Sequence, residues 1–234
     1  MEGSAPRDVQ TKMVVSESSI FETIGGGNLE YQAIHKARDL IADRKPFIGI
    51  ETFSLGRDLS QCCGGKVELL FEAFPACEFE IMLFGAGHVG RSLVQILAEL
   101  PCRVRWFDAR SDQFPDDPQF WRKRPNVEKV ISTQPITAVE SCPANAWYLV
   151  MTHSHETDYE VCEAILTRQD ARFCGLIGSK SKAAKFRNQL SRKGFSDAEI
   201  AGLTCPIGLG QIPGKAPMAV SVSIAAQLLE LQGQ

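Results

Sequence analysis

A short apolar run, residues 81–84 (I-M-L-F), leads directly into the glycine-rich turn of residues 85–90 (G-A-G-H-V-G). A strand, a G-x-G-x-x-G turn and a helix in this order are typical of a phosphate-binding βαβ unit. Gly85 permits the tight turn, Gly87 lets the backbone approach a phosphate, and Gly90 allows the helix to pack closely on the strand. The pattern predicts a nucleotide or related phosphate ligand, and the alternative is a Rossmann turn that binds nothing tightly.

Alternating strand and helix patterns continue from this turn to the end of the chain, which is typical of a parallel α/β sheet. We expect strands at 80–84, 103–108, 127–131, 146–151 and 173–177, and helices at 88–99, 157–168, 180–193 and 216–231. These elements predict a Rossmann-like sheet of order 3-2-1-4-5. Asp108 closes the second strand, where a carboxylate is placed to bond a ribose hydroxyl.

The first third of the chain has a different pattern, and we expect it to form a small α/β domain of its own over residues 1–77. Strands are expected at 12–15, 19–24, 47–53 and 66–74, with one helix that begins at Asn28 as N-cap and runs to about residue 44. Residues 78–234 then form the Rossmann-like domain.

Composition excludes several classes of protein. The 234 residues carry a net charge of −3, which argues against an electrostatically driven nucleic-acid binder. No apolar run is long enough to span a membrane, and the first residues contain no apolar core of a secretory signal. Eight cysteines in such a chain suggest a reducing compartment, so we expect a cytoplasmic protein.

The segment 151–158 (M-T-H-S-H-E-T-D) follows the fourth strand of the expected sheet, at the edge where ligands bind. In an extended segment His153 and His155 point the same way, so they are candidates for a metal pair with Asp158 as a third ligand. Two other interpretations are a polar lining of a cofactor site and, for Asp158, a cap on the next helix. Compared with the T-H-x-H-x-D-H run of metallo-β-lactamase-like hydrolases, the aspartate here is displaced by one position and the following histidine is absent, which argues against a tightly bound catalytic zinc.

Residues 178–182 (G-S-K-S-K) open a helix after the fifth strand. Helix N-terminal amides combined with lysines form an anion site, and Ser179, Lys180 and Lys182 are the candidates nearest the sheet edge. The alternative is a solvated basic face.

Residues 61–65 (Q-C-C-G-G) place the two thiols of Cys62 and Cys63 beside the flexible residues Gly64 and Gly65. A disulfide between adjacent cysteines is strained, so these thiols are candidates to meet a metal centre or a sulfur-bearing ligand. The other six cysteines lie mostly in apolar segments and are interpreted as packing residues.

Several blocks together resemble one family, the xanthine dehydrogenase accessory proteins, also called the XdhC/CoxI family. The blocks are E-G-S-A-P-R at 2–7, T-I-G-G-G-N-L-E at 23–30, Q-C-C-G-G at 61–65, the turn at 85–90, T-H-S-H at 152–155, G-L-I-G-S-K at 175–180 and C-P-I-G at 205–208. The resemblance covers almost the whole chain. Family members usually carry a further strand and helix before the first block, so we expect the first domain to lack them.

The resemblance implies a carrier rather than an enzyme. Members bind molybdenum cofactor (molybdopterin), protect it from oxidation, and deliver its sulfurated form to xanthine dehydrogenase or a related molybdenum hydroxylase, working alongside a cysteine desulfurase. On this basis Cys62 and Cys63 would lie near the metal or its sulfur, and the glycine turns and Lys180 would hold phosphate. Cofactor carriers often dimerise, so a homodimer is an open expectation.

Two alternatives of another class remain. A nicotinamide-dependent oxidoreductase would use the 85–90 turn for NAD(P), although no convincing proton-transfer pair accompanies it. A metal-dependent hydrolase would use His153, His155 and Asp158.

Overall fold

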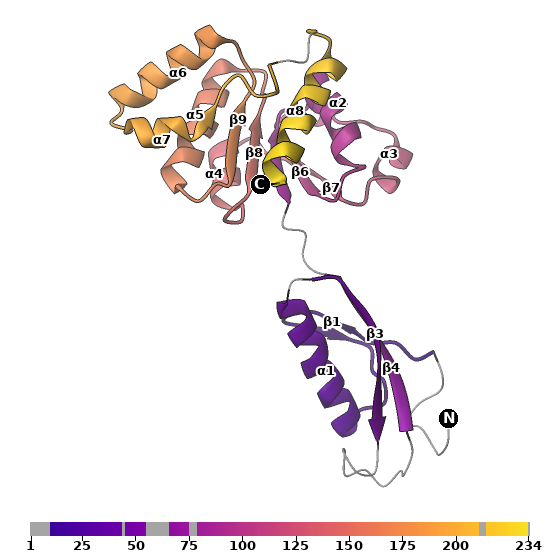
Figure 1. Ribbon diagram of the computed structural model, residues 1–234. Helices are drawn as coiled ribbons and strands as arrows, with labels where there is room; N and C mark the ends of the chain where they lie inside the picture. Colours follow the sequence, from indigo (N-terminus) through magenta and orange to yellow (C-terminus); the bar gives the residue numbers. More distant parts are fainter. Residues whose placement is uncertain (1–9, 44, 55–65, 75–78, 211–213, 234) are drawn as a thin grey trace. The chain divides into compact units, whose positions relative to one another are not determined.

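The structure is a computed structural model that describes residues 10–43, 45–54, 66–74, 79–210 and 214–233. The chain divides into two compact units, Met1–Ala76 and Cys77–Gln234 (Figure 1). Each unit has its own buried core, and each is described by itself.

The first unit packs one helix against a two-stranded antiparallel sheet. Helix α1 (Gly27–Ala42) covers one face of strands β3 (Phe47–Ser54) and β4 (Lys66–Ala73). Leu29 and Ala33 of the helix meet apolar side chains of both strands. A second, shorter pair consists of β1 (Val14–Val15) and β2 (Ile20–Phe21).

The start of α1 corrects the prediction that Asn28 is its N-cap. The cap position is Gly26, and Gly25, Gly26 and Gly27 have φ angles of 123°, 75° and 69°, a region that favours glycine. The carboxylate of Glu30 accepts hydrogen bonds from the Thr23 hydroxyl and from the N–H groups of Ile24 and Gly26, both at 3.0 Å. The glycine run therefore folds back over Glu30, whose carboxylate binds N–H groups that precede the helix, as the glutamate of a capping box does.

The second unit is built on a six-stranded parallel sheet of order β10-β9-β8-β5-β6-β7. The strands are β5 (Glu80–Phe84), β6 (Arg103–Asp108), β7 (Val127–Ile131), β8 (Trp147–Val150), β9 (Phe173–Leu176) and β10 (Leu203–Thr204). The Rossmann-like fold and the order of the five expected strands are confirmed. The prediction of only five strands is wrong, because β10 has two residues and is too short to show a periodic pattern.

Helices cover both faces of this sheet. The structure has α2 (His88–Leu97), α3 (Pro118–Arg122), α4 (Pro135–Glu140), α5 (His155–Arg168), α6 (Lys180–Arg192), α7 (Asp197–Ala201) and α8 (Pro217–Gln232), with a 3-10 turn at Ser111–Gln113. In Figure 1, α2 and α8 lie on one face, and α4 and α5 lie on the other. The short helices α3 and α4 were not predicted, since five or six residues give little helical periodicity.

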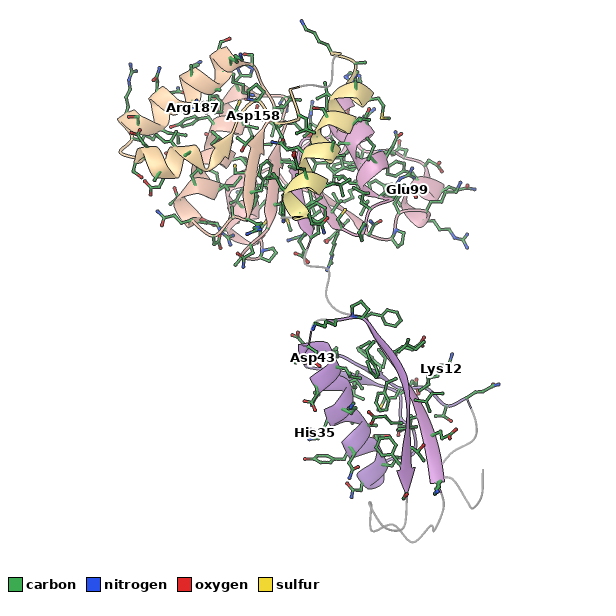
Figure 2. The ribbon with its side chains drawn as sticks, viewed as in Figure 1. Lys12, His35, Asp43, Glu99, Asp158 and Arg187 are labelled. Atoms are coloured by element: carbon green, nitrogen blue, oxygen red, sulfur yellow. The ribbon has the colours of Figure 1, made fainter. Side chains whose placement is uncertain are left out.

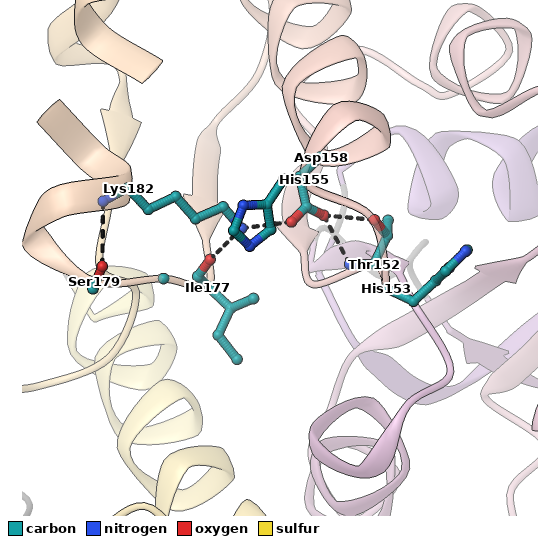
Figure 3. A pocket seen from close by; sticks show the side chains of 8 residues that line it. Thr152, His153, His155, Asp158, Ile177, Ser179 and Lys182 are labelled. Atoms are coloured by element: carbon teal, nitrogen blue, oxygen red, sulfur yellow. Dashed lines mark hydrogen bonds and ion pairs between the residues drawn. The ribbon is translucent and has the colours of Figure 1, made fainter. Parts of the chain in front are cut away.

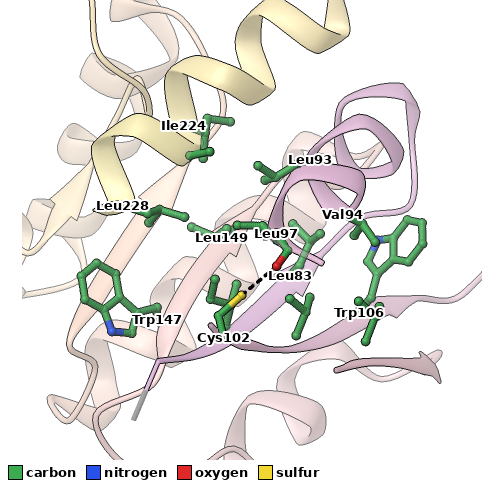
Figure 4. Close-up of a cluster of buried hydrophobic side chains, with 14 of the residues drawn as sticks. Leu83, Leu93, Val94, Leu97, Cys102, Trp106, Trp147, Leu149, Ile224 and Leu228 are labelled. Atoms are coloured by element: carbon green, nitrogen blue, oxygen red, sulfur yellow. Dashed lines mark hydrogen bonds between the residues drawn. The ribbon is translucent and has the colours of Figure 1, made fainter. Parts of the chain in front are cut away.

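Alternation along β5 explains the two layers. Ile81 and Leu83 point into the cluster formed with α2 and α8 (Figure 4). Met82 and Phe84 point into a second cluster, formed with α4, α5 and α6. Because every second side chain of a strand faces the same side, a strand covered on both faces is apolar throughout, as this run is.

Two further sequence patterns predict details of the helices, and both are confirmed. Apolar residues at helical spacing predict the core face of α8, where Ile224 and Leu228 are fully buried and Val220 and Leu231 pack beside them. The segment 196–199 (S-D-A-E) predicts a capping box, and at α7 Ser196 accepts from the Glu199 N–H while the Glu199 carboxylate accepts from the Ser196 N–H at 2.8 Å. Among the helices in the described ranges, none combines the length and the apolar character needed to cross a bilayer.

Candidate functional site

The carboxyl ends of the strands place three turns along one edge of the sheet. The glycine turn (residues 85–90) follows β5, the segment 151–154 follows β8, and residues 177–179 follow β9. The chain passes from β5 to β6 on one side and reaches β8 on the other, so a topological switch point lies between β5 and β8. Ligands of such sheets bind outside the strand ends at this point.

The glycine turn has the backbone geometry that its pattern predicts. Gly85 has φ 116°, and a Cβ there would lie 2.2 Å from the Met151 carbonyl oxygen. A Cβ on Gly90 would lie 2.2 Å from the Gly85 carbonyl oxygen. A Cβ on Gly87 would meet no described atom within 4 Å. Gly85 and Gly90 are therefore required by packing inside the protein, whereas Gly87 faces open space.

Asp108 lies beside this turn, and its carboxylate is already in use. Oδ2 accepts from the Ala86 N–H at 2.7 Å, and Oδ1 accepts from the Arg110 N–H at 2.9 Å. The Arg110 guanidinium donates to both oxygens at 3.0 Å. Burial alone would raise the pKa of Asp108, but the hydrogen bonds from Arg110 and Ala86 lower it below its ordinary value. Arg110 was not identified from the sequence as a partner of Asp108. The feature that could have indicated it is its position, two residues after the acid that ends β6.

The two histidines do not point the same way. Ser154 is the N-cap of α5, and its hydroxyl oxygen accepts from the Thr157 N–H at 3.3 Å, so His155 already belongs to the helix. Figure 3 shows the ring of His153 directed away from Asp158 and Lys182, while His155 lies on their side. The expected common direction is wrong, because the segment is a helix start rather than an extended strand. Within the described ranges, no group of three or more His, Cys, Asp or Glu side chains is arranged to hold a metal ion.

Asp158 is neither a helix cap nor an exposed ligand. Its side chain is 1% exposed. Its carboxylate hydrogen-bonds both to Thr152, in the turn after β8, and to Lys182 of α6. Oδ1 accepts from the Thr152 N–H at 2.8 Å and from the Thr152 hydroxyl at 2.7 Å, and Oδ2 accepts from Lys182 Nζ at 2.6 Å. Asp158 lies inside the unit, whereas Arg187 on the same side of the sheet is exposed (Figure 2).

Lys182 completes this connection from α6. Its Nζ also donates to the Ile177 carbonyl at 3.0 Å, and its side chain is 9% exposed. A Cβ on Gly178 would lie 2.8 Å from Lys182 Cδ, so glycine leaves room for the lysine to reach back under the turn. Ser179 is the N-cap of α6, and its hydroxyl oxygen accepts from the Lys182 N–H at 3.2 Å. Lys180 is exposed at the first position of the helix.

These two turns enclose a pocket of about 300 Å³, which we call the serine-capped pocket (Figure 3). Its lining combines residues 152, 153, 155 and 158 after β8 with residues 177, 178, 179 and 182 after β9. The structure therefore brings His153, His155, Ser179 and Lys182 of the predicted site together. Lys180 is not among the lining residues, and neither are Gly85, Gly87, Gly90 and Asp108, which lie at the neighbouring turn.

Most of the cysteines that the structure describes are packing residues. Cys102, Cys142, Cys162 and Cys174 are buried, and Cys205 is half-buried beside Gly178. A hydrogen bond with Cys174, together with burial, raises the pKa of the Cys162 thiol well above its ordinary value. Cys62, Cys63, Gly64 and Gly65, for which a cofactor contact is predicted, lie outside the described residues, as does Cys77.

The second unit is therefore a Rossmann-type α/β domain with a polar pocket at the carboxyl edge of its sheet. The model of the XdhC Rossmann domain matches residues 81–228, and the model of the XdhC and CoxI family matches residues 1–54. The chain belongs to the XdhC and CoxI family.

Two known proteins place the chain in context. The Escherichia coli (strain K12) protein YqeB is 27% identical over 232 residues, which is 98% of this chain and 42% of YqeB. The chain thus spans less than half the length of this curated relative. A crystal structure from Bacillus halodurans, described as a xanthine dehydrogenase, superposes with a TM-score of 0.54 at 18% identity and covers 99% of this chain and 89% of that one. The latter likeness shows a shared fold.

Proposed function

We propose that this chain is an accessory protein of a molybdenum hydroxylase of the xanthine dehydrogenase type. It binds molybdenum cofactor as its cargo and delivers the sulfurated form to that enzyme. The observation that carries the proposal is the family match, because it covers parts of both compact units.

The cargo suits the residues at the sheet edge. Molybdenum cofactor contains a pterin, a dithiolene-bound metal and a phosphate. The serine-capped pocket offers lysine, histidine and serine side chains and two helix N-termini, which suit the anionic end of such a molecule. Ser179, Lys180, Lys182, His153 and His155 are the residues proposed to contact it.

The opposite end of the cargo is rich in sulfur. Thiolates are soft ligands suited to such a metal centre, and they also shield a labile sulfido group from oxidation. We assign this role to Cys62 and Cys63, flanked by Gly64 and Gly65, on the chemistry of the sequence.

A carrier must bind and release its cargo, and it needs no group that moves a proton in a chemical step. This fits a pocket in which Asp158 and Lys182 neutralise each other at 2.6 Å. We therefore propose a non-enzymatic role, in the cytoplasm, with a molybdenum hydroxylase and a cysteine desulfurase as partners and a homodimer as the working form.

Anaerobic loading of the purified full chain with molybdenum cofactor tests this role, with molybdenum and pterin measured after gel filtration. The parent should retain both, and Cys62→Ser or Cys63→Ser should retain less and activate a target hydroxylase less. Cys142→Ala, a change at a buried thiol away from the pocket, is the control and should behave as the parent. Equal retention in all variants would remove the two thiols from the mechanism, and no retention by the parent would refute the role itself.

A second candidate function is dinucleotide binding at the glycine turn, which is favoured by the open space in front of Gly87. The carboxylate of Asp108 opposes it, because Ala86 and Arg110 already occupy the oxygens that would bond a ribose. Calorimetric titration with NAD and NADP separates the two candidates. If the parent binds NAD or NADP and Gly87→Val abolishes that binding, the result would favour an oxidoreductase.

A further inference from the structure

We infer that the serine-capped pocket is a phosphomonoester site and that Asp158 is its positioning residue. The inference deepens the proposed function, on which the identity of the natural ligand rests. The binding itself requires no molybdenum and can be tested without it.

The first step is the balance of donors and acceptors. Asp158 contributes the only carboxylate among the pocket-lining residues that the structure describes. Its oxygens already accept three hydrogen bonds, two from Thr152 and one from Lys182. An ionised carboxylate has no proton to donate, so Asp158 offers little to a ligand. The side chains that remain are those of Lys182, Ser179, His153 and His155, each of which carries at least one donor, and Lys182 carries a positive charge, so together they suit an anion.

The second step is the ammonium group of Lys182. An ammonium has three protons, and two of them are donated to Asp158 Oδ2 at 2.6 Å and to the Ile177 carbonyl at 3.0 Å. Among the described residues the third N–H has no hydrogen-bond acceptor, and Nζ lies 5.4 Å from the centroid of the Phe186 ring. Because Lys182 lines the pocket, this N–H is the one we assign to a ligand. Because both other bonds are fixed, this proton has a defined direction instead of the freedom of a surface lysine.

The third step is the pair of helices that begin at the pocket. Helices α5 and α6 have 14 and 13 residues, and both have a serine N-cap. A helix leaves its first N–H groups without intrahelical acceptors. The Ser154 hydroxyl accepts from the Thr157 N–H, and the Ser179 hydroxyl accepts from the Lys182 N–H and also lies 3.2 Å from the Ser181 hydroxyl. His155 lines the pocket at the first position of α5, so its N–H has no intrahelical acceptor and is the helix-end donor we assign to a ligand.

The fourth step is size and reach. A phosphate has several acceptor oxygens and fits a pocket of about 300 Å³, which is at the small end of ligand sites. Thr152 belongs to the turn after β8 and Lys182 to helix α6, and among the described residues only Asp158 bonds both of them. Asp158 therefore fixes the distance between the two groups of donors, which is the role of a positioning residue.

Calorimetry on the full chain at constant ionic strength tests this inference, with glycerol 3-phosphate as probe and glycerol as blank. The parent should bind the phosphate ester and not glycerol. The double variant Asp158→Asn with Lys182→Met replaces a buried ion pair by neutral side chains of similar size, a change that proteins commonly tolerate. We expect it to bind at least about tenfold more weakly, since it loses a charge-assisted hydrogen bond.

The control is a second lysine–acid pair that joins the same two helices outside the pocket. Lys193 Nζ lies 2.6 Å from the Glu163 carboxylate. The variant Glu163→Gln with Lys193→Met alters charge in the same way and should keep the affinity of the parent. Equal weakening in both double variants would overturn the inference.

Asp158→Asn alone separates position from charge. It makes the pocket more positive, so an acid that acted only by cancelling charge would give tighter binding when it is removed. We expect weaker binding, because Lys182 loses the partner that directs it. Tighter binding in the folded single variant would overturn the positioning role.

The outcomes also separate this inference from the proposed function. Retention of molybdenum cofactor by a parent that binds no phosphate ester would leave the function standing and refute the pocket. Binding of the phosphate ester without retention of the cofactor would support the phosphomonoester site and refute the proposed function.

Discussion

The glycine turn and the serine-capped pocket lie at the same edge of one sheet, yet they use their polar groups in opposite ways. In the glycine turn, the Gly85 N–H donates to the Phe107 carbonyl at 2.8 Å and the Ala86 N–H donates to Asp108 at 2.7 Å. In the pocket, the acid is internally satisfied and the donors face a cavity. The polar groups of the glycine turn mainly bond other parts of the protein, whereas those of the serine-capped pocket are positioned to bind a ligand.

The difference teaches that a glycine pattern predicts backbone geometry more securely than it predicts chemistry. Gly85 and Gly90 are needed because any side chain would collide with backbone oxygens, whatever the turn binds. What a turn can bind depends on the N–H groups and carboxylates that are not already hydrogen-bonded within the protein.

The largest effect should come from Gly85→Ala. The new Cβ would lie 2.2 Å from the Met151 carbonyl oxygen at a φ of 116°, so both a collision and backbone strain arise. We expect a loss of about 3 kcal/mol or more from the free energy of unfolding. All three tryptophans, Trp106, Trp121 and Trp147, lie in this unit, so urea unfolding followed by tryptophan fluorescence reports on it.

Gly87→Ala is the matched control for that prediction, since its Cβ meets nothing within 4 Å. We expect a change below about 1 kcal/mol. Equal destabilisation by the two substitutions would contradict the difference in packing between Gly85 and Gly87.

Asp108→Asn should weaken the same junction without affecting the pocket. Hydrogen bonds to a charged group contribute about 1.5–3 kcal/mol, and we expect a loss in that range near neutral pH. The pKa of Asp108 is lowered by folding, so its contribution is present above the unfolded-state pKa and is lost as the pH falls through the folded value. The difference in stability between parent and variant should therefore shrink on acidification, while affinity for glycerol 3-phosphate stays unchanged. A difference that grows in acid would contradict the assignment.

Ser179→Ala tests the pocket side of the comparison. Loss of an N-cap costs about 1 kcal/mol, and here the capped helix also faces the ligand. We expect a loss of stability and a several-fold weaker binding of the phosphate ester. Ser196→Ala removes the cap of α7, which does not line the pocket, and should lower stability alone.

The smallest effect is expected for His153→Ala. Its ring points away from Asp158 and Lys182, and it is exposed. We expect stability to change by no more than about 0.5 kcal/mol and the metal content to stay the same. Elemental analysis checks this, and stoichiometric zinc that disappears in the variant would restore the hydrolase interpretation.

Much of the Rossmann unit follows from sequence, because β5 is a continuous apolar run in front of a glycine turn and α2 has apolar residues at helical spacing. The turn chemistry follows less well. Glu30 accepts from backbone N–H groups, and Arg110 donates to the Asp108 carboxylate, through local folding that no periodicity encodes. Asp158 was interpreted as a metal ligand or cap, since its partner Lys182 is 24 residues away and meets it only once two strands are side by side.

The most direct measurement of the central claim is the molybdenum and pterin content of three proteins after anaerobic loading: the parent, Gly87→Val, and the double variant Asp158→Asn with Lys182→Met. If the serine-capped pocket holds the phosphate end of the cofactor, the parent and Gly87→Val retain molybdenum and pterin together, and the double variant loses both. Retention by the double variant with loss in Gly87→Val would contradict this account and transfer the ligand to the glycine turn.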